Sequence, residues 1–165
     1  KLEEIVRAIH ENSSNHKLLI FSQFLGMLDL IRQHLDKVGI PYEYLDGQTT
    51  DRAGRVNRFQ NDQECRVFLM SLKAGGVGLN LTEADYVYLM DPWWNPAVEK
   101  QAIDRTHRIG QTRKVFAYKM ICKDTIEEKI LLLQERKQEL AEDLVGGEAG
   151  FIKKLSLEDI MGLFS

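Results

Sequence analysis

Apolar residues recur along the chain with the spacing of helices in some segments and of strands in others. Leu2, Ile5 and Ile9 are spaced as on one face of a helix, until the polar run Asn12–Asn15 interrupts them. The next segment, Lys17–Ser22, is apolar almost throughout, which is typical of a strand buried on both faces. The alternation continues, and we predict a helix from Leu25 that stops at Gly39, helices at 51–60 and 96–109, and strands at 41–45, 66–71, 86–90 and 115–121.

Strands that alternate with helices predict an α/β fold, with a doubly wound, mostly parallel sheet and helices on both faces. In such sheets, ligands bind beyond the carboxyl ends of the strands. The loops that follow Phe21, Leu45, Met70 and Met90 are therefore the places where we expect functional residues.

A different pattern follows the last predicted strand. The segment Thr125-Ile-Glu-Glu128 has the form of a capping box, and it opens a long amphipathic helix that continues through Leu144. Beyond the pair Gly146-Gly147 there is room for one short helix near Ser156. We therefore predict one α/β domain at 1–123, a long helix at 124–148 and a tail at 149–165.

Composition narrows the class of protein. The chain has 165 residues, of which 44% are apolar and 28% charged, as in one compact domain. Its apolar runs are too short to cross a bilayer, and its first residues do not resemble a signal peptide, so we expect no membrane contact. Cys65 and Cys122 lie far apart in apolar segments, which favours two buried thiols in a reducing, intracellular compartment.

The net charge of −3 argues against an autonomous, strongly basic DNA-binding module. The cations are nevertheless concentrated, since no carboxylate occurs between Arg105 and Lys123, whereas Asp124–Glu148 is mainly acidic. A solvated face is the simple explanation for either run, and we favour it for the acidic one.

A dense glycine segment, KAGGVGLN, separates two predicted strands and permits three interpretations. It is a dinucleotide-binding fingerprint, a tight turn that requires positive φ, or a surface of main-chain amides that binds phosphates of a nucleic acid. The fingerprint lacks its third glycine, because Leu81 stands at that position, and no long helix follows. The tight turn and the phosphate-binding surface both stay open, and we favour the second.

The segment QAIDRTHRIGQ places Gln101, Arg105 and Arg108 on one helical face. Two guanidinium groups side by side repel each other unless a polyanion neutralises them, although pairing with carboxylates elsewhere is the structural alternative. His107 lies off this face, which favours a packing role. The sequence shows no nucleophile with a base, no acid and base pair and no cluster of metal ligands.

The segments SLKAGGVGLNL, DPWWNP and QAIDRTHRIGQ, in this order and spacing, resemble motifs V and VI of the SNF2 family of superfamily 2 DNA translocases. LLIFSQF and YLDGQT resemble the motif IV region of the same family. The resemblance covers essentially the whole chain. It implies a second RecA-like lobe, the helicase C-terminal domain, of a larger ATP-dependent motor that tracks along double-stranded DNA and remodels protein–DNA complexes.

The resemblance also implies roles for individual residues. Arg105 and Arg108 match the arginine fingers, which reach the γ-phosphate of ATP held by the other lobe, and Gln101 supports them. The long helix from Thr125 would pack across the lobes as a brace. The positions that would face DNA or the groove between the lobes are Ser22, Gln23, Asp46, Gly47, Ser71, Lys73, Gly75, Gly76 and Gly78.

The sequence lacks a G-x-x-x-x-G-K-[ST] loop and an Asp-Glu pair that ends a strand. We therefore expect ATP and Mg²⁺ to be held mainly by an N-terminal RecA-like lobe, none to be bound to this chain alone, and the isolated lobe to be inactive. The expected partners are that lobe and double-stranded DNA, in the nucleoid of a prokaryote or the nucleus of a eukaryote.

Other interpretations stay open at this point. Trp93 and Trp94 either stack on bases or pack against neighbouring elements, and we favour packing because a double-strand tracker meets few unstacked bases. The chain as a whole is alternatively a DNA-binding or protein-interaction module that kept the fold without the motor. A dinucleotide-dependent enzyme is a weaker alternative, given the missing glycine.

Overall fold

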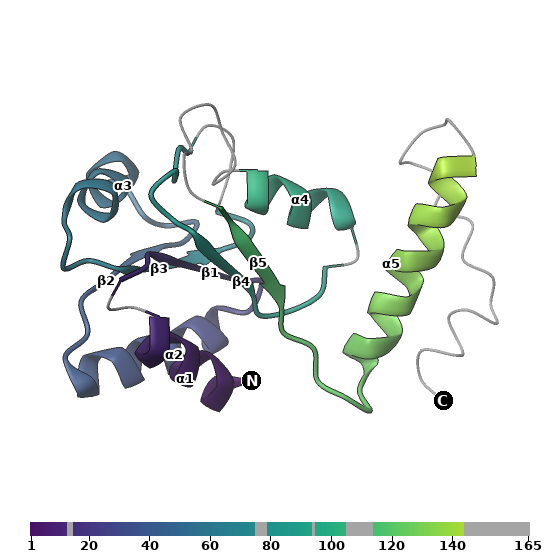
Figure 1. The fold of residues 1–165 in the computed structure, drawn as a ribbon, viewed down its shortest axis with the longest axis horizontal. Helices are drawn as coiled ribbons and strands as arrows, with labels where there is room; N and C mark the ends of the chain where they lie inside the picture. The colour runs from purple at the N-terminus through teal and green to yellow at the C-terminus, as the bar shows by residue number, and fades with distance from the viewer. Residues whose placement is uncertain (13–14, 75–78, 94, 105–113, 144–165) are drawn as a thin grey trace.

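The helices and strands follow one another in the predicted order (Figure 1). The structure, a computed structural model, describes residues 1–12, 15–74, 79–93, 95–104 and 114–143, the last six without their side chains. The helices are α1 (Leu2–Asn12), α2 (Leu25–Val38), α3 (Arg52–Asn61), α4 (Pro96–Asp104) and α5 (Ile126–Asp143), and the strands are β1 (Leu18–Ser22), β2 (Tyr42–Leu45), β3 (Val67–Ser71), β4 (Tyr86–Leu89) and β5 (Phe116–Lys119).

All strand pairs in the five-stranded sheet are parallel, in the order β2-β3-β1-β4-β5. Helices α1 and α2 cover one face of the sheet and α3 and α4 the other, whereas α5 lies to one side (Figure 1). The doubly wound α/β fold predicted from the sequence is therefore confirmed. The boundary predicted at 123–124 stays a prediction, although α5 begins close to it.

The central strand β1 contributes to two separate cores. Leu19 and Phe21 pack in one apolar cluster with Phe59 of α3. Leu18 and Ile20 point to the opposite face and pack in a second cluster with Ile5 of α1 and with residues of α2. All residues of β1 are buried, because side chains alternate between two covered faces.

Local signals define several helix ends. Gly39 follows α2 in the left-handed conformation, with φ 71°, and its amide donates to carbonyl oxygens of the last turn. The Asp51 carboxylate accepts from the Gly54 amide at 2.9 Å at the start of α3. A Cβ on Gly54 would lie 2.2 Å from that carboxylate, so this glycine makes room for the cap. The end of α3 is held by Lys17, whose buried ammonium donates to the carbonyl oxygens of Phe59 and Asp62.

The start of α5 differs in detail from the predicted capping box. The Thr125 hydroxyl accepts from the Glu127 amide at 3.3 Å, one residue earlier in the helix than a capping box requires. Glu128 Oε2 accepts from the Asp124 amide instead of the Thr125 amide, at 3.1 Å. Asp124 has φ 57°, and this left-handed residue turns the chain so that its amide faces the helix. Residues 144–148 of the predicted helix lie outside the described residues.

Edge strand β5 is the main departure from the predicted burial. Its residues are exposed, because one edge has no strand partner in the described part of the chain. Aromatic rings protect part of it, since Tyr118 stacks on Tyr88 with ring centroids 5.2 Å apart and Phe116 on Tyr86 at 5.4 Å. Cys122 follows this strand and is only half buried, so the expectation of two buried thiols holds for Cys65 alone.

Burial has a chemical consequence for Cys65. Desolvation, and to a lesser degree the nearby Glu43 carboxylate, raises the pKa of its thiol to about 11. The thiol is therefore protonated and poorly reactive at neutral pH. No described helix is both long enough and apolar enough to span a bilayer.

The assigned core can be tested by creating a cavity beside β3. Phe68 is fully buried, and its ring lies 5.2 Å from that of Phe59. Phe68→Ala should lower the free energy of unfolding by about 3–5 kcal/mol, measured by urea denaturation followed by circular dichroism. Leu30→Ala, at a side chain of α2 that is 47% exposed, should cost less than about 1 kcal/mol. Equal losses for the two variants would contradict the assigned core.

Candidate functional site

The carboxyl ends of the parallel strands form one edge of the sheet, and several predicted site residues lie there. Ser22 ends β1 and Ser71 ends β3, and the two are partners in register. Asp46 and Gly47 follow β2, the other neighbour of β3. The topology therefore brings together positions that are far apart in the sequence.

Asp91 joins the ends of β1 and β4. Its buried carboxylate accepts from the Ser22 hydroxyl at 2.7 Å and from the Gln23 amide at 2.9 Å. The Gln23 side chain donates to the Pro92 carbonyl oxygen at 3.3 Å. The Ser22 hydroxyl also accepts from the Phe24 amide, at 3.0 Å, which fixes the turn into α2. Sequence reasoning missed Asp91 as a site residue, although it follows an apolar strand and opens the segment DPWWNP.

Hydrogen bonds hold the first residues of the loop after β3 in place. Ser71 is buried, and the Leu72 amide donates to the Ser22 carbonyl oxygen at 3.0 Å. Arg52 of α3 donates to the Ala74 carbonyl oxygen at 3.2 Å, a contact that the sequence did not indicate. Lys73 is exposed between these anchors. Gly75, Gly76 and Gly78 lie outside the described residues, so the interpretations of the glycine segment are not distinguished.

The turn after β2 is stabilised by the Asp46 carboxylate. It accepts from the Gln48 amide at 2.9 Å, the Thr49 hydroxyl at 3.0 Å and the Tyr44 hydroxyl at 3.1 Å. Partial burial by itself would raise the pKa of Asp46, but these hydrogen bonds outweigh it, and the pKa is lowered from the usual 3.8. Gly47 at the tip of the turn is exposed, with open space around its Cα.

The segment DPWWNP leads from β4 into α4. Trp93 is half buried and packs against the apolar cluster between the sheet and α3 and α4, which agrees with the packing interpretation. Trp94 lies outside the described residues. Gln101 is exposed on α4, and the described part of this helix ends at Asp104. Arg105 and Arg108 lie outside the described residues, as do His107 and the end of the predicted helix.

The described residues offer two further facts about ligands. They contain no group of three or more His, Cys, Asp or Glu side chains that is arranged to hold a metal ion. A cavity of about 580 Å³ lies at the β2 edge, and Arg55 and Arg58 in its lining each pair with the buried Glu43 carboxylate, at 3.0 and 2.8 Å. The whole lining holds three arginines and three carboxylates, so its charges balance, and the cavity does not replace the strand ends as the candidate site.

The chain was compared with known protein families and solved structures. The model of the helicase conserved C-terminal domain matches residues 1–110. Among solved structures, the crystal structure of the C-terminal part of the Fun30 ATPase domain superposes with a TM-score of 0.75 and 37% sequence identity. That similarity covers 79% of this chain and 44% of the Fun30 chain.

Curated relatives resemble the chain over nearly all of its length. The ATP-dependent helicase rhp16 of Schizosaccharomyces pombe is 44% identical over 170 residues, which is 100% of this chain and 20% of that protein. The DNA repair protein rad8 of the same yeast is 44% identical, over 96% of this chain and 14% of rad8. An uncharacterized ATP-dependent helicase of Mycoplasma genitalium, MG018, is 42% identical, over 99% of this chain and 16% of that protein. The chain thus corresponds to between 14% and 20% of the length of these relatives.

The Asp46 turn predicts a pH dependence of stability. Because the pKa of Asp46 is lowered in the folded state, its charged form stabilises the fold fully above the unfolded value near 3.8, and this contribution is lost as the pH falls through the folded value. Asp46→Asn should therefore lower the free energy of unfolding at neutral pH, by about 1 kcal/mol or less, and the difference from the unchanged chain should shrink in acid.

Urea denaturation between pH 3 and pH 7 measures this difference. Asp29→Asn, at an exposed carboxylate of α2 whose contact is a surface ion pair with Arg32, is the matched control and should have a smaller effect at neutral pH. A difference for Asp46→Asn that stays constant or grows in acid would show that the turn does not depend on the carboxylate charge.

Proposed function

The chain belongs to the helicase conserved C-terminal domain family and, within it, to the SNF2 family, and on this premise we propose that it is one lobe of an ATP-driven translocase on double-stranded DNA. The observation that carries the proposal is the meeting of the motif segments at one edge of the sheet. Ser22, Asp46, Ser71 and Asp91 come from four different parts of the sequence and end or follow four parallel strands. Ligands of open parallel sheets bind at this edge.

The ATPase chemistry would be shared between two lobes. This chain has no phosphate-binding loop with a lysine, so we expect ATP and Mg²⁺ to be held mainly by an N-terminal RecA-like lobe. Arg105 and Arg108 would enter the cleft and stabilise the charge on the transferring phosphoryl group, with Gln101 in support. An arginine finger accelerates phosphoryl transfer roughly 10³ to 10⁵-fold, which corresponds to about 4–7 kcal/mol of barrier.

The DNA contacts would come from exposed groups at the same edge. The hydroxyls of Ser22 and Ser71 are buried, so these two residues would shape the loops and contribute main-chain groups at most. Lys73 is exposed and supplies a cation, and the tip of the turn at Gly47 is exposed beside it in the proposed surface. The amides of Gly75, Gly76 and Gly78 would complete a phosphate-binding surface.

The cellular setting follows from the same proposal. A motor of this type would act on protein–DNA complexes, and so in the nucleus of a eukaryote or on the nucleoid of a prokaryote. Its brace would be α5, which follows the arginine segment and β5 in the sequence.

The finger assignment is tested on this chain joined to its own upstream polypeptide. Arg108→Ala should lower ATP turnover in the presence of duplex DNA by roughly a thousandfold or more, since the transition-state charge loses its partner. DNA affinity should stay within about twofold, measured by fluorescence anisotropy. Arg7→Ala, at an exposed arginine of α1 that pairs with Glu4, is the matched control and should leave turnover unchanged.

Two results would contradict the motor. One is Arg108→Ala with the full turnover of the unchanged protein. The other is DNA binding without turnover in either form, which would favour a DNA-binding module that kept the fold. The isolated chain should show no turnover above background, and a rate typical of ATPases, on the order of 1 per second or more, would overturn the shared-site proposal.

The DNA surface predicts a salt effect. Lys73→Ala should weaken binding of the two-lobe protein to duplex DNA equally for different sequences, and should reduce the slope of log affinity against log salt by about 1, because one phosphate contact is lost. Lys37→Ala, at an exposed lysine near the end of α2, is the matched control. An unchanged slope for Lys73→Ala, or an equal change for Lys37→Ala, would exclude Lys73 from the contact.

A further inference from the structure

A cluster of polar side chains, two of them buried, lies where α4, β5 and α5 meet. It consists of Glu99 of α4, Lys119 of β5, Gln134 of α5 and the main chain of Trp93, and is called the Glu99 cluster below. Glu99 is 2% exposed and Gln134 4% exposed, although both residue types are normally found at surfaces. Buried polar groups need complete partners, so the contacts of this cluster are informative.

The Glu99 carboxylate is bound from three directions. One oxygen, Oε1, accepts from the Trp93 amide at 2.7 Å and from the Gln134 side-chain amide at 3.0 Å. The other, Oε2, pairs with the Lys119 ammonium at 2.5 Å. A buried carboxylate that lost these partners would be costly to the fold.

Gln134 fits this arrangement in one orientation only. Its amide nitrogen donates to Glu99 Oε1 and to the Trp93 carbonyl oxygen. Its oxygen accepts from the Lys119 ammonium at 3.3 Å. A flipped amide would set oxygen against oxygen and nitrogen against nitrogen, so both ends of the side chain are specified.

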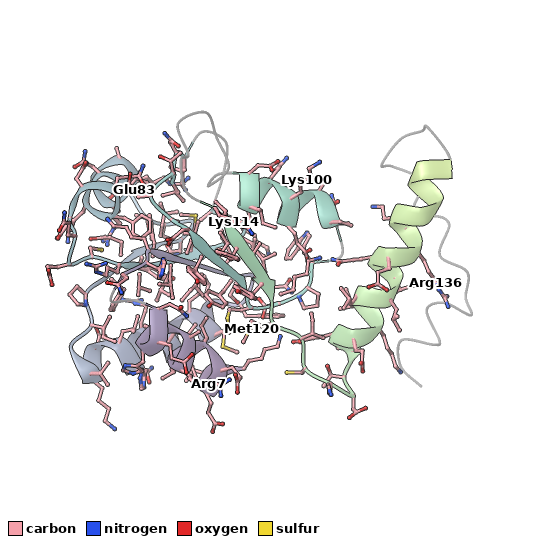
Figure 2. The ribbon with its side chains drawn as sticks, viewed as in Figure 1. Arg7, Glu83, Lys100, Lys114, Met120 and Arg136 are labelled. Atoms are coloured by element: carbon pink, nitrogen blue, oxygen red, sulfur yellow. The ribbon has the colours of Figure 1, made fainter. Side chains whose placement is uncertain are left out.

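The cluster attaches α5 to the rest of the chain. Along α5, Ile130 and Gln134 are the buried side chains among those described, and they lie one turn apart on the same face. Arg136 points away from α4 (Figure 2). The long helix, which lies beside the sheet (Figure 1), is thus held at Ile130 and Gln134, and also near its start, where Glu127 pairs with Lys1.

The same cluster also fixes the start of α4. Glu99 lies in the first turn of α4, and its bond to the Trp93 amide ties that turn to the segment DPWWNP. Arg105 lies six positions after Glu99 in the sequence. A shift of α4 would therefore move the point from which the arginine segment starts.

We propose that Glu99, Lys119 and Gln134 are positioning residues that link the docking of α5 to the placement of the arginine segment 105–108. This inference rests on the proposed function, because it assigns the segment a role in ATP turnover. The cluster does not touch ATP in this account. It acts through α4, and a displacement of about 1 Å at a reacting group costs on the order of a hundredfold in rate.

Gln134→Glu in the two-lobe protein tests the link. The variant keeps the shape of the side chain but replaces both donors with an oxygen that faces Glu99 and the Trp93 carbonyl. The charged groups that face position 134 among the described residues are Glu99 of α4 and Lys119 of β5. Repulsion from Glu99 should raise the pKa of the new carboxyl, whereas Lys119 favours its charged form, so a fall in pH should protonate it and restore a donor.

The expected result separates turnover from binding. Near pH 8, kcat for DNA-stimulated ATP hydrolysis should fall about tenfold to a hundredfold, with KM for ATP and the affinity for duplex DNA within about twofold. As the pH is lowered, kcat relative to the unchanged protein should recover. Gln33→Glu makes the same chemical change at an exposed position of α2 and should show neither effect.

A second variant and a second measurement keep the two proposals separate. Gln134→Met has no donors and no charge, so it should lose kcat without recovery in acid. Hydrogen exchange of the α5 amides is measured in the same proteins and corrected for intrinsic rates. In Gln134→Glu, exchange should be faster near pH 8 than at lower pH, whether or not ATP is hydrolysed.

The outcomes are distinct. If the unchanged protein shows no DNA-stimulated turnover, the proposed function fails, and exchange still tests whether the cluster holds α5. If the unchanged protein turns over ATP and both Gln134 variants keep its kcat, the link is wrong. Faster exchange in α5 with unchanged kcat would show that the cluster holds α5 but does not affect turnover. A loss of DNA affinity equal to the loss of kcat would also overturn the positioning role.

Discussion

The parallel pairing of β1 with both β3 and β4 is the constraint on which the rest of the structure depends. Because β1 lies between two parallel neighbours, the three strands end at the same edge, and their loops must lie side by side. The side chains of β1 are buried on both faces of the sheet, so helices have to cover each side. One short apolar strand thus determines both the two cores and the location of the candidate site.

Buried carboxylates fix the loops at that edge. Asp91 joins the end of β1 to the end of β4, and Glu99 joins the start of α4 to β5 and α5. Each carboxylate accepts main-chain amides as well as a side-chain donor, which specifies loop conformation more sharply than apolar contacts do. Lys73 and Gln101, whose side chains are exposed, are then presented from a fixed base.

The sequence was sufficient for the fold because its signals are local. The continuous apolar run at 18–21 and the periodic residues of α2 predict a covered parallel sheet without reference to distant partners. The motif segments likewise identified the strand ends where Ser22, Asp46 and Ser71 lie. Whether these positions contact DNA, and whether Arg105 and Arg108 act on ATP, stays a prediction.

What the sequence did not predict depends on distant partners. The exposure of β5 follows from its place at the edge of the sheet, and the half-buried state of Cys122 from its position after that strand. Asp91, Arg52 and Gln134 are recognised only when their partners from other elements are known. The start of α5 departed from the predicted capping box because one left-handed residue, Asp124, changed which amide faces Glu128.

The most direct test of the central claim is the rate of ATP hydrolysis by this chain joined to its upstream polypeptide, measured with and without saturating duplex DNA. The account predicts that duplex DNA raises the rate severalfold or more, because the DNA surface and the arginine segment belong to the same lobe. A rate that is measurable but identical with and without duplex DNA would contradict it.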